Sequence, residues 1–242
     1  MLPAQPNQSL IDGLACLQAL AVSTGPVGNR ALARQLGLEP TRVNRLLKTL
    51  AHLGMARQDP DRKYLPGPAM HVLSALSLFG SGLIRRAIGP LESLHPLAEL
   101  VAMGVLWREH VCYVYHAERG MPPSAAIGRV GLFPATQSSI GRVLLAYQDE
   151  GQVREMYGDR EVPDYASPEA LLEDLRAIRG QGYAYVARSE GPYQRALGMP
   201  VGSPPYAAVA LTPVAAEKLE EVLPILRGVA EQVGGEGRNA ET

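Results

Sequence analysis

Residues 29–54 carry the pattern that most constrains the fold. The segment RALARQLG predicts a short helix with Asn29 as N-cap and an end at Gly37, and LEP then leads into a second helix over residues 41–53. Two helices joined by a short turn that contains glycine are typical of a helix-turn-helix. A preceding helix is predicted over residues 9–22, because SLID is a capping-box start and leucines follow it at helical spacing.

A hairpin is predicted directly after these helices. The segment MARQDPDRKYLPG has two short stretches of strand character around the turn DPD, and a hairpin in this place is the wing of a winged helix-turn-helix. The prolines of PGP then mark a domain boundary. We therefore expect a winged helix-turn-helix domain over residues 1–66, a linker helix over 67–82 and a second domain over 83–242.

The second domain alternates helix and strand signals. Helices are expected over 83–100, with bends at its prolines, in SIGRVLLAYQ, EGQVREMYG and SPEALLEDLRAIRGQG, and over 213–233. Strands are expected over 101–107, 111–117, 126–133, 183–187 and 206–212. This order predicts an α+β domain with a mixed or antiparallel sheet flanked by helices, the first and last of which could both flank the sheet.

The charge of the chain is unevenly distributed. The whole chain has a formal net charge of −1, whereas residues 1–66 hold eight Lys and Arg against four Asp and Glu, a net charge of +4, which leaves −5 on the rest. A basic head on an acidic body is typical of a nucleic-acid-binding domain joined to a domain with another task.

The composition indicates a cytoplasmic location. Cys16 and Cys112 lie far apart and give no disulfide framework, which suits a reducing compartment. The first residues do not form a signal peptide, and no apolar run approaches the ~18 residues that a membrane span requires, so we expect no membrane association.

The helix over residues 41–53 has one apolar and one polar face. On a helical wheel, its valine and leucines lie within about 60° of one direction, and Thr41, Asn44, Arg45 and Lys48 lie opposite. That polar face has no acidic residue, whereas a merely solvated face usually mixes both signs. Since Asn and Arg contact base edges and Lys suits phosphate oxygens, we predict that this helix reads double-stranded DNA.

The candidate DNA contacts come from this helix, the one before it and the wing. We expect base contacts from Thr41, Asn44 and Arg45. Arg42 and Lys48 are expected to contact either a base or a phosphate. The remaining candidates are Asn29, Arg57, Arg62 and Lys63. Two alternatives remain open at this point: an ordinary solvated helix face, and a winged helix that binds a protein.

Several segments together resemble one known family. The run from Ser9 through ALARQLGL and TRVNRLLKTLAHLGMARQD to YLPGP resembles the winged helix-turn-helix of the IclR family of bacterial transcription regulators. The segment RVGLFPATQSSIGRVLLA (129–146) resembles the signature VG…P…GK…LLA, with Gly141-Arg142 at the Gly-Lys step. RGQGYAY (179–185) and GMPV (198–201) lie where the family has GYA and AAPV. The resemblance spans nearly the whole chain, and the order and spacing of its motifs carry it.

The resemblance implies an N-terminal DNA-binding domain, a linker helix and a GAF-like C-terminal domain that binds a small effector. It also implies a homodimer or a dimer of dimers on a pseudo-palindromic operator, because the two-fold symmetry of the protein would match that of the DNA. No cofactor is implied.

This sequence departs from the family at several functional positions. Asp12 stands where members usually carry an Arg, so a DNA contact from the first helix is expected to be absent. Polar effector ligands of the family are replaced by apolar residues at four positions: Val186, Ala196, and Val209 and Leu211, the last two with an uncertainty of one residue in register.

The polar groups that remain to bind an effector are at the start of the helix, at Ser138-Ser139-Ile140 followed by Gly141. The free backbone N–H groups there could bind an anion or a carbonyl. Loss of the other polar groups argues against a small hydroxy- or keto-acid. We expect a larger, mostly apolar or aromatic effector, or a site that no longer binds one.

The sequence does not predict an enzyme. No G-x-S-x-G surrounds Ser138 or Ser139, and there is no Walker A loop or H-E-x-x-H. Alternation would place His110, Cys112 and His116 on one strand face, but the usual zinc spacings are absent, so no metal is expected. A small-molecule enzyme fused to a DNA-binding head stays open as an alternative, although it would need a catalytic constellation.

Overall fold

The chain forms two compact units, Met1–Ser81 and Gly82–Thr242. The structure, a computed structural model, describes residues 5–128, 131–158, 160–187 and 194–235. Each unit has a hydrophobic core of its own.

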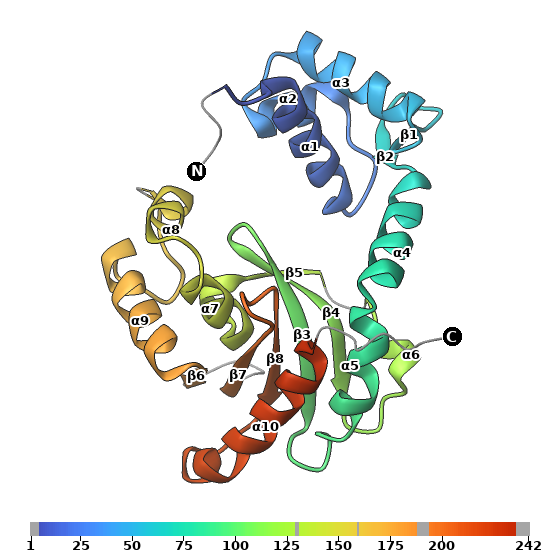
Figure 1. Cartoon of the computed structure of the whole chain (residues 1–242). Helices are drawn as coiled ribbons and strands as arrows, with labels where there is room; N and C mark the ends of the chain where they lie inside the picture. The colour runs from blue at the N-terminus through green and yellow to red at the C-terminus, as the bar shows by residue number, and fades with distance from the viewer. Residues whose placement is uncertain (1–4, 129–130, 159, 188–193, 236–242) are drawn as a thin grey trace. The chain divides into compact units, whose positions relative to one another are not determined.

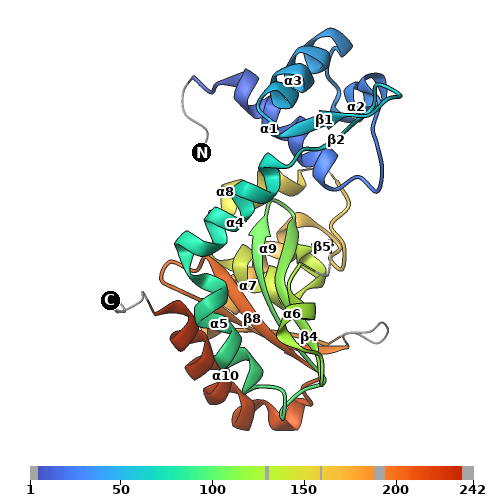
Figure 2. The ribbon, with the colours of Figure 1, turned by 90° about the vertical axis from the view of Figure 1, so that its right-hand side faces the viewer.

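The first unit is a winged helix-turn-helix, as predicted. Its elements are α1 (Gln8–Ala21), α2 (Asn29–Leu36), α3 (Pro40–His52), β1 (Ala56–Gln58), β2 (Tyr64–Pro66) and α4 (Ala69–Ser81). The first three helices pack around Leu20, Leu32 and Leu47, each of which is fully buried. β1 and β2 pair antiparallel as the wing, beside α3 (Figure 2).

Two helix starts in this unit differ from the prediction. The side chain of Asn7, not Ser9, caps α1, because it accepts a backbone N–H at 3.1 Å. Gly28 is the N-cap of α2, so Asn29 lies inside the helix, and its Nδ2 donates instead to the carbonyl oxygen of Pro40 at 3.1 Å. The Asn29 amide therefore connects α2 to the start of α3.

The second unit is built on a six-stranded sheet in the order β5-β4-β3-β8-β7-β6, in which every pairing is antiparallel. Of the two predicted kinds of sheet, the antiparallel one is therefore present. The strands are β3 (Leu100–Trp107), β4 (His110–Glu118), β5 (Leu132–Pro134), β6 (Ala184–Ala187), β7 (Arg195–Val201) and β8 (Ala207–Thr212).

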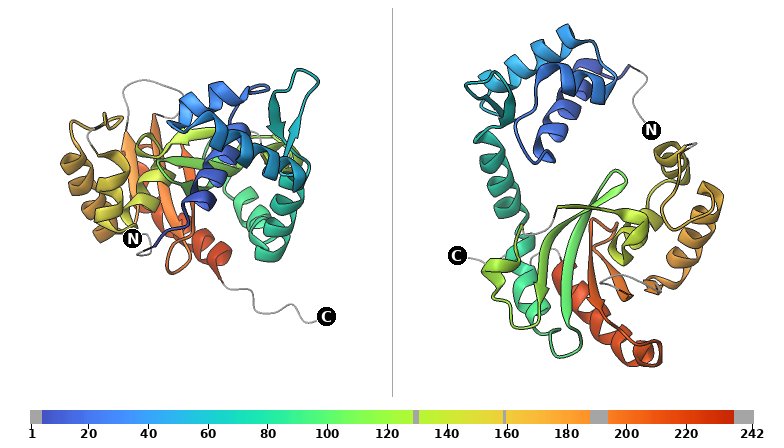
Figure 3. Two further views of the ribbon diagram at one scale, coloured as in Figure 1. Left: turned by 90° about the horizontal axis from the view of Figure 1, so that it is seen from above. Right: turned by 180° about the vertical axis from the view of Figure 1, so that it is seen from behind.

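Helices cover both faces of this sheet (Figure 1; seen from behind in Figure 3). One face carries α5 (Leu83–Glu92), the short α6 (Pro123–Ala126) and α10 (Leu219–Gly234), and the other carries α7 (Ser139–Ala146), α8 (Glu150–Tyr157) and α9 (Pro168–Gln181). All six residues of β8 are buried, because alternate side chains enter the cores on opposite faces.

Three predicted elements needed correction, and one strand was missed. The helix predicted to run to residue 100 ends at Glu92, and the one predicted from residue 213 starts at Leu219, after a 3₁₀ turn at Ala216–Lys218. Of the strand predicted over 126–133, only Leu132 and Phe133 belong to a strand, β5, and two of its residues, 129 and 130, lie outside the described residues. The strand β7 was not predicted, because its glycine and proline lower the strand signal.

A β-bulge in β4 changes which side chains share a face. Met103 pairs with Tyr115 but the next residue, Gly104, pairs with Tyr113, so Val114 is an extra residue in the ladder. The bulge places Tyr113 and His116 on the same face, with ring centroids 5.3 Å apart, although they are three residues apart in sequence.

Because of the same bulge, the prediction that His110, Cys112 and His116 share one strand face is wrong. Cys112 lies opposite Val105, which packs on the α10 side, whereas His116 lies opposite Ala102, which packs on the α7 side. His110, Cys112 and His116 therefore do not share one face. In the described ranges, no three His, Cys, Asp or Glu residues gather as a possible metal site.

No helix among the described residues is by itself long and apolar enough to span a membrane, and α4 with α5 passes that test only as one broken span.

Candidate nucleic-acid interface and ligand pocket

The exposed face of α3 carries the polar residues that the sequence singled out. Thr41, Arg45 and Lys48 are exposed and Asn44 is half-buried, while Val43 is fully buried on the opposite side. Arg45 and Lys48 make no ion pair within the described part of the chain. The cationic groups on this face are thus available to an external anion.

Arg42 differs from its neighbours on α3. Its Nε lies 2.6 Å from Oδ2 of Asp12 on α1, and the Asp12 side chain is almost completely buried. The other carboxylate oxygen of Asp12 accepts a hydrogen bond from Gln8 at 2.8 Å. A buried carboxylate therefore holds the Arg42 guanidinium against the body of the unit.

The wing presents Arg57 on β1 and Arg62 and Lys63 on the turn, all of which are exposed. Asp59 closes the turn, since its backbone N–H donates to the carbonyl oxygen of Lys63 at 2.8 Å and its side chain accepts from the backbone N–H of Lys63 at 2.8 Å. The backbone of the loop is fixed in this way, and none of the three cations forms an ion pair within the described ranges.

A small cavity lies in the second unit between the sheet and the start of α7. Its volume is about 30 Å³, room for about one water molecule. Its lining comes from strands β3, β4, β5, β7 and β8, from the segment before α7 and from the first turn of α7. It consists of Leu100, Ala102, Tyr113, His116, Phe133, Gln137, Ser138, Ser139, Ile140, Ala196, Ala210 and Thr212.

Half of the predicted effector residues line this cavity: Ser138, Ser139, Ile140 and Ala196. Val186 pairs with Ala196 in the sheet and therefore shares its face, but it does not line the cavity.

Val209 and Leu211 point to the opposite face and belong to the core under α10. The assumed register was one residue off, because Ala210 and Thr212 of the same strand line the cavity instead. Of the two β8 residues that line the cavity, Thr212 carries a hydroxyl.

Aromatic side chains form one wall of the cavity. The hydroxyl of Tyr113 lies 3.1 Å from that of Ser138, which in turn accepts the backbone N–H of Gly141 at 3.3 Å. The Tyr113 ring meets His116 edge-on and lies 6.4 Å from Phe133. The bulge in β4 places Tyr113 and His116 on this face, and a bulge leaves no clear signal in the sequence.

Two glycines allow close packing at the start of α7, one against the turn before this helix and one against strand β7. A Cβ on Gly141 would lie 2.1 Å from the carbonyl oxygen of Ala135, and one on Gly198 would lie 2.7 Å from the backbone of Ser139. Gly141 does not line the cavity, so its place in the motif serves close packing.

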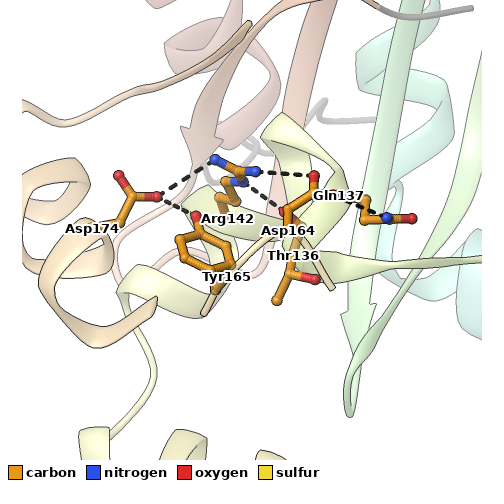
Figure 4. A network of polar contacts seen from close by, with 6 residues as sticks. All are labelled: Thr136, Gln137, Arg142, Asp164, Tyr165 and Asp174. Atoms are coloured by element: carbon orange, nitrogen blue, oxygen red, sulfur yellow. Dashed lines mark hydrogen bonds and ion pairs between the residues drawn. The ribbon is translucent and has the colours of Figure 1, made fainter. Parts of the chain in front are cut away.

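Arg142 is the centre of a polar network next to the cavity (Figure 4). Its Nε donates to the carbonyl oxygen of Thr136 at 2.6 Å, and its terminal nitrogens lie 3.3 Å from Asp164 and 3.6 Å from Asp174. The guanidinium lies over the Tyr165 ring, 4.8 Å from its centroid. Burial and the hydrogen bond to Asp174 raise the pKa of Tyr165, so its hydroxyl stays protonated and donates.

Comparison with known proteins identifies this architecture. The family model described as "IclR helix-turn-helix domain" matches residues 9–60, and that described as "Bacterial transcriptional regulator IclR C-terminal" matches residues 77–234. The chain belongs to the IclR family. The predicted family membership is confirmed.

The relatives agree with this assignment. The chain is 30% identical to the transcriptional repressor IclR of Escherichia coli, over 74% of this chain and 68% of that protein. A crystal structure of an IclR family regulator from Brucella abortus has a TM-score of 0.74 and 24% identity, covering 95% of this chain and 92% of the other. An IclR homologue from Microbacterium hydrocarbonoxydans, complexed with 4-hydroxybenzoate, has a TM-score of 0.63 and 19% identity, covering 93% and 97%.

The IclR assignment decides the general function of the chain. It is a ligand-responsive DNA-binding transcriptional regulator, with a helix-turn-helix unit and an effector-binding C-terminal unit. The named relatives are regulators rather than enzymes.

Proposed function

We propose that α3 reads base edges of a pseudo-palindromic operator through Thr41, Asn44 and Arg45. Lys48 and the wing cations Arg57, Arg62 and Lys63 contact the phosphates. The observation that carries this assignment is the exposed, acid-free face of α3, whose cations have no ion pair in the described chain.

Arg42 and Asn29 have minor roles at this interface. Arg42 is held by Asp12, and the amide of Asn29 is already bonded to Pro40. Both side chains therefore support the placement of α3 more than they read DNA. The DNA-binding domain comprises residues 1–66, the linker helix 67–82 and the effector-binding domain 83–242.

The effector is a small molecule of aromatic or otherwise apolar character that binds at the cavity between the sheet and α7. The support for this assignment is an apolar lining with three aromatic rings, those of Tyr113, His116 and Phe133. The homologue complexed with 4-hydroxybenzoate agrees with an effector of this class. Since the cavity is small as it stands, binding requires the half-buried Tyr113 to move away from Ser138.

The protein acts as a homodimer, or a dimer of dimers, through the linker helix. No residue of α4 is buried in the chain, although Val72, Leu76 and Phe79 form an apolar stripe whose exposed fractions are 56%, 61% and 83%. An apolar stripe of this kind needs a partner surface, and two-fold pairing would place two reading helices on two half-sites.

Effector binding alters DNA affinity by favouring one arrangement of the two heads over another, because a ligand shifts an equilibrium only through its differential affinity. A regulator of this kind works on chromosomal DNA, which places it in the cytoplasm.

Fluorescence anisotropy tests the DNA assignment. The full-length protein is titrated onto DNA from upstream of its own gene at several salt concentrations, beside Arg45→Ala, Lys48→Ala and the control Lys218→Ala, an exposed cation of the second unit. A plot of the logarithm of the binding constant against the logarithm of the salt concentration should be linear. We expect its slope to be about −0.9 for each phosphate that the protein neutralises. Arg45→Ala should abolish the preference over random DNA, and Lys48→Ala should weaken binding to all sequences evenly.

Salt-resistant binding, or an Arg45→Ala protein that keeps its preference, would favour the alternative of a winged helix that binds a protein.

For the effector, a thermal-shift screen with the full-length protein compares aromatic carboxylates with short hydroxy- and keto-acids. Stabilisation by aromatic compounds that is lost in Ala196→Phe, which fills the cavity, supports the assignment. Stabilisation by the short acids alone contradicts it.

A further inference from the structure

The amide of Gln137 lies between the cavity and the Arg142 network. Gln137 lines the cavity, and its Nε2 donates to Oδ1 of Asp164 at 3.1 Å. The other carboxylate oxygen of Asp164 faces the Arg142 guanidinium at 3.3 Å. Each oxygen of this one carboxylate is therefore used by a different partner.

This arrangement determines the orientation of the amide. An ionised carboxylate only accepts hydrogen bonds, so the group that Gln137 turns towards Asp164 must be its NH₂. The amide oxygen then points away from Asp164, as Figure 4 shows. No hydrogen bond to that oxygen is present within the described part of the chain.

Asp164 itself is held in place. Its backbone has a φ of 70°, the left-handed region that Asp and Asn tolerate better than most residues. Arg142 fixes the carboxylate while also bonding the carbonyl oxygen of Thr136, the residue before Gln137. Rotation of the Gln137 amide would therefore direct its NH₂ at the cavity and its oxygen at a carboxylate, which is repulsive.

Three hydroxyls of the lining have partners within the protein. Tyr113 and Ser138 bond each other, and Thr212 donates to the carbonyl oxygen of Arg195 at 3.3 Å. The Gln137 oxygen, in contrast, is a fixed acceptor with unused capacity at an otherwise mostly apolar site.

We infer that Gln137 is a specificity residue that selects effectors carrying a hydrogen-bond donor, such as a phenolic hydroxyl, and that Asp164 is the residue that positions it. This inference rests on the proposed effector site and adds the chemical class of its ligand. An apolar or aromatic body satisfies the lining, and the hydroxyl donates to Gln137. An analogue without the donor leaves the amide oxygen without a partner, at a cost of affinity.

Isothermal titration of the full-length protein with 4-hydroxybenzoate, 4-methoxybenzoate and benzoate tests this inference. The methyl ether keeps the ring and the oxygen but cannot donate. We expect the wild type to bind 4-hydroxybenzoate about tenfold more tightly than 4-methoxybenzoate. Gln137→Leu should reduce that ratio to about one, and Gln137→Met, of similar length, is the second variant if the first does not fold.

Two further variants separate selection from general damage. Gln152→Leu, an exposed glutamine of α8, should keep the wild-type ratio. Asp164→Asn tolerates the same backbone conformation but lets the Gln137 amide turn, so it should lower the ratio while 4-methoxybenzoate binds as well as before or better. If the role of Asp164 is purely structural, the Asp164→Asn protein should bind all three ligands more weakly and to the same degree.

The outcomes distinguish this inference from the function on which it rests. Equal affinity for the hydroxyl and methoxy compounds in the wild type, or a ratio unchanged by both Gln137 variants, overturns the role of Gln137 and leaves the aromatic site standing. Failure of all three compounds to bind overturns the aromatic-effector assignment and this inference with it.

Discussion

Asp12 of α1 and Arg42 of α3 form an ion pair, with 2.6 Å between Oδ2 and Nε. The Asp12 carboxylate holds one cation of α3 and adds a negative charge beside the proposed DNA-binding face. We therefore expect Asp12→Asn to raise DNA affinity and to increase the salt slope by about one unit, because Arg42 becomes free to bind a phosphate.

Anisotropy with a double-mutant cycle measures this effect. Arg42→Ala should cost little in the wild-type background and clearly more in the Asp12→Asn background. Glu39→Gln is the matched control, because it removes one exposed negative charge next to α3 without releasing Arg42. An Arg42→Ala effect that is equal in both backgrounds would show that Asp12 does not restrain Arg42.

Local signals predicted the reading helix well. The apolar period of α3 gave its buried face, and Ser167 with Pro168 marked the start of α9, where the Ser167 hydroxyl accepts the backbone N–H of Ala170. Both features depend on residues within one or two turns, so the sequence contains the whole signal.

The pocket was less predictable because its geometry depends on pairing between distant strands. The extra residue Val114 shifts the alternation of β4, and no local pattern marks it. On β8 both faces are buried, so alternation of apolar and polar residues was missing and Val209 was assigned to the wrong face. Ser138 was placed correctly, since a helix cap is a local feature.

Gly141 provides a test of the packing around α7. Its missing side chain lets the helix lie against Ala135, and a Cβ would lie 2.1 Å from a backbone oxygen that cannot move easily. We expect Gly141→Ala to lower the free energy of unfolding by about 2–3 kcal/mol, as overpacking of a core does.

Urea unfolding followed by circular dichroism gives this value, with Gly180→Ala in α9 as control. A Cβ on Gly180 meets no atom within 4 Å, so that change should be neutral or stabilise by up to about 1 kcal/mol, through helix propensity. Equal stabilities of the two variants would contradict the packing role of Gly141.

The apolar stripe on α4, formed by Val72, Leu76 and Phe79, is the proposed dimer interface, so substitutions in it should prevent dimerisation. Leu76→Glu or Phe79→Ser should convert the dimer to a monomer, because each change removes apolar area from the shared surface. Light scattering after gel filtration measures the mass. Ser74→Glu, on the opposite side of the same helix, should remain dimeric. A Leu76→Glu protein that keeps the wild-type mass would exclude this stripe as the interface.

Tyr157 predicts a loss of stability at alkaline pH. Burial, and to a lesser degree the charge of Glu109, raises its pKa from 10.0 to about 12. The pKa of this group is higher in the folded state than in the unfolded chain, so its stabilising contribution is fully present at a pH below about 10. That contribution is lost as the pH rises from about 10 to 12, because the tyrosine of the unfolded chain ionises first. At about pH 11 we expect the wild type to have lost about 1 kcal/mol relative to Tyr157→Phe.

The matched comparison is Tyr115→Phe. The Tyr157 hydroxyl has no hydrogen-bond partner among the described residues, whereas that of Tyr115 donates to Glu92. At pH 8 we therefore expect Tyr157→Phe to leave the free energy of unfolding unchanged or slightly raised, and Tyr115→Phe to lower it by about 1 kcal/mol. Urea unfolding at pH 8 and 11 measures both. If Tyr157→Phe is as sensitive to alkaline pH as the wild type, the Tyr157 hydroxyl does not ionise on unfolding in this range.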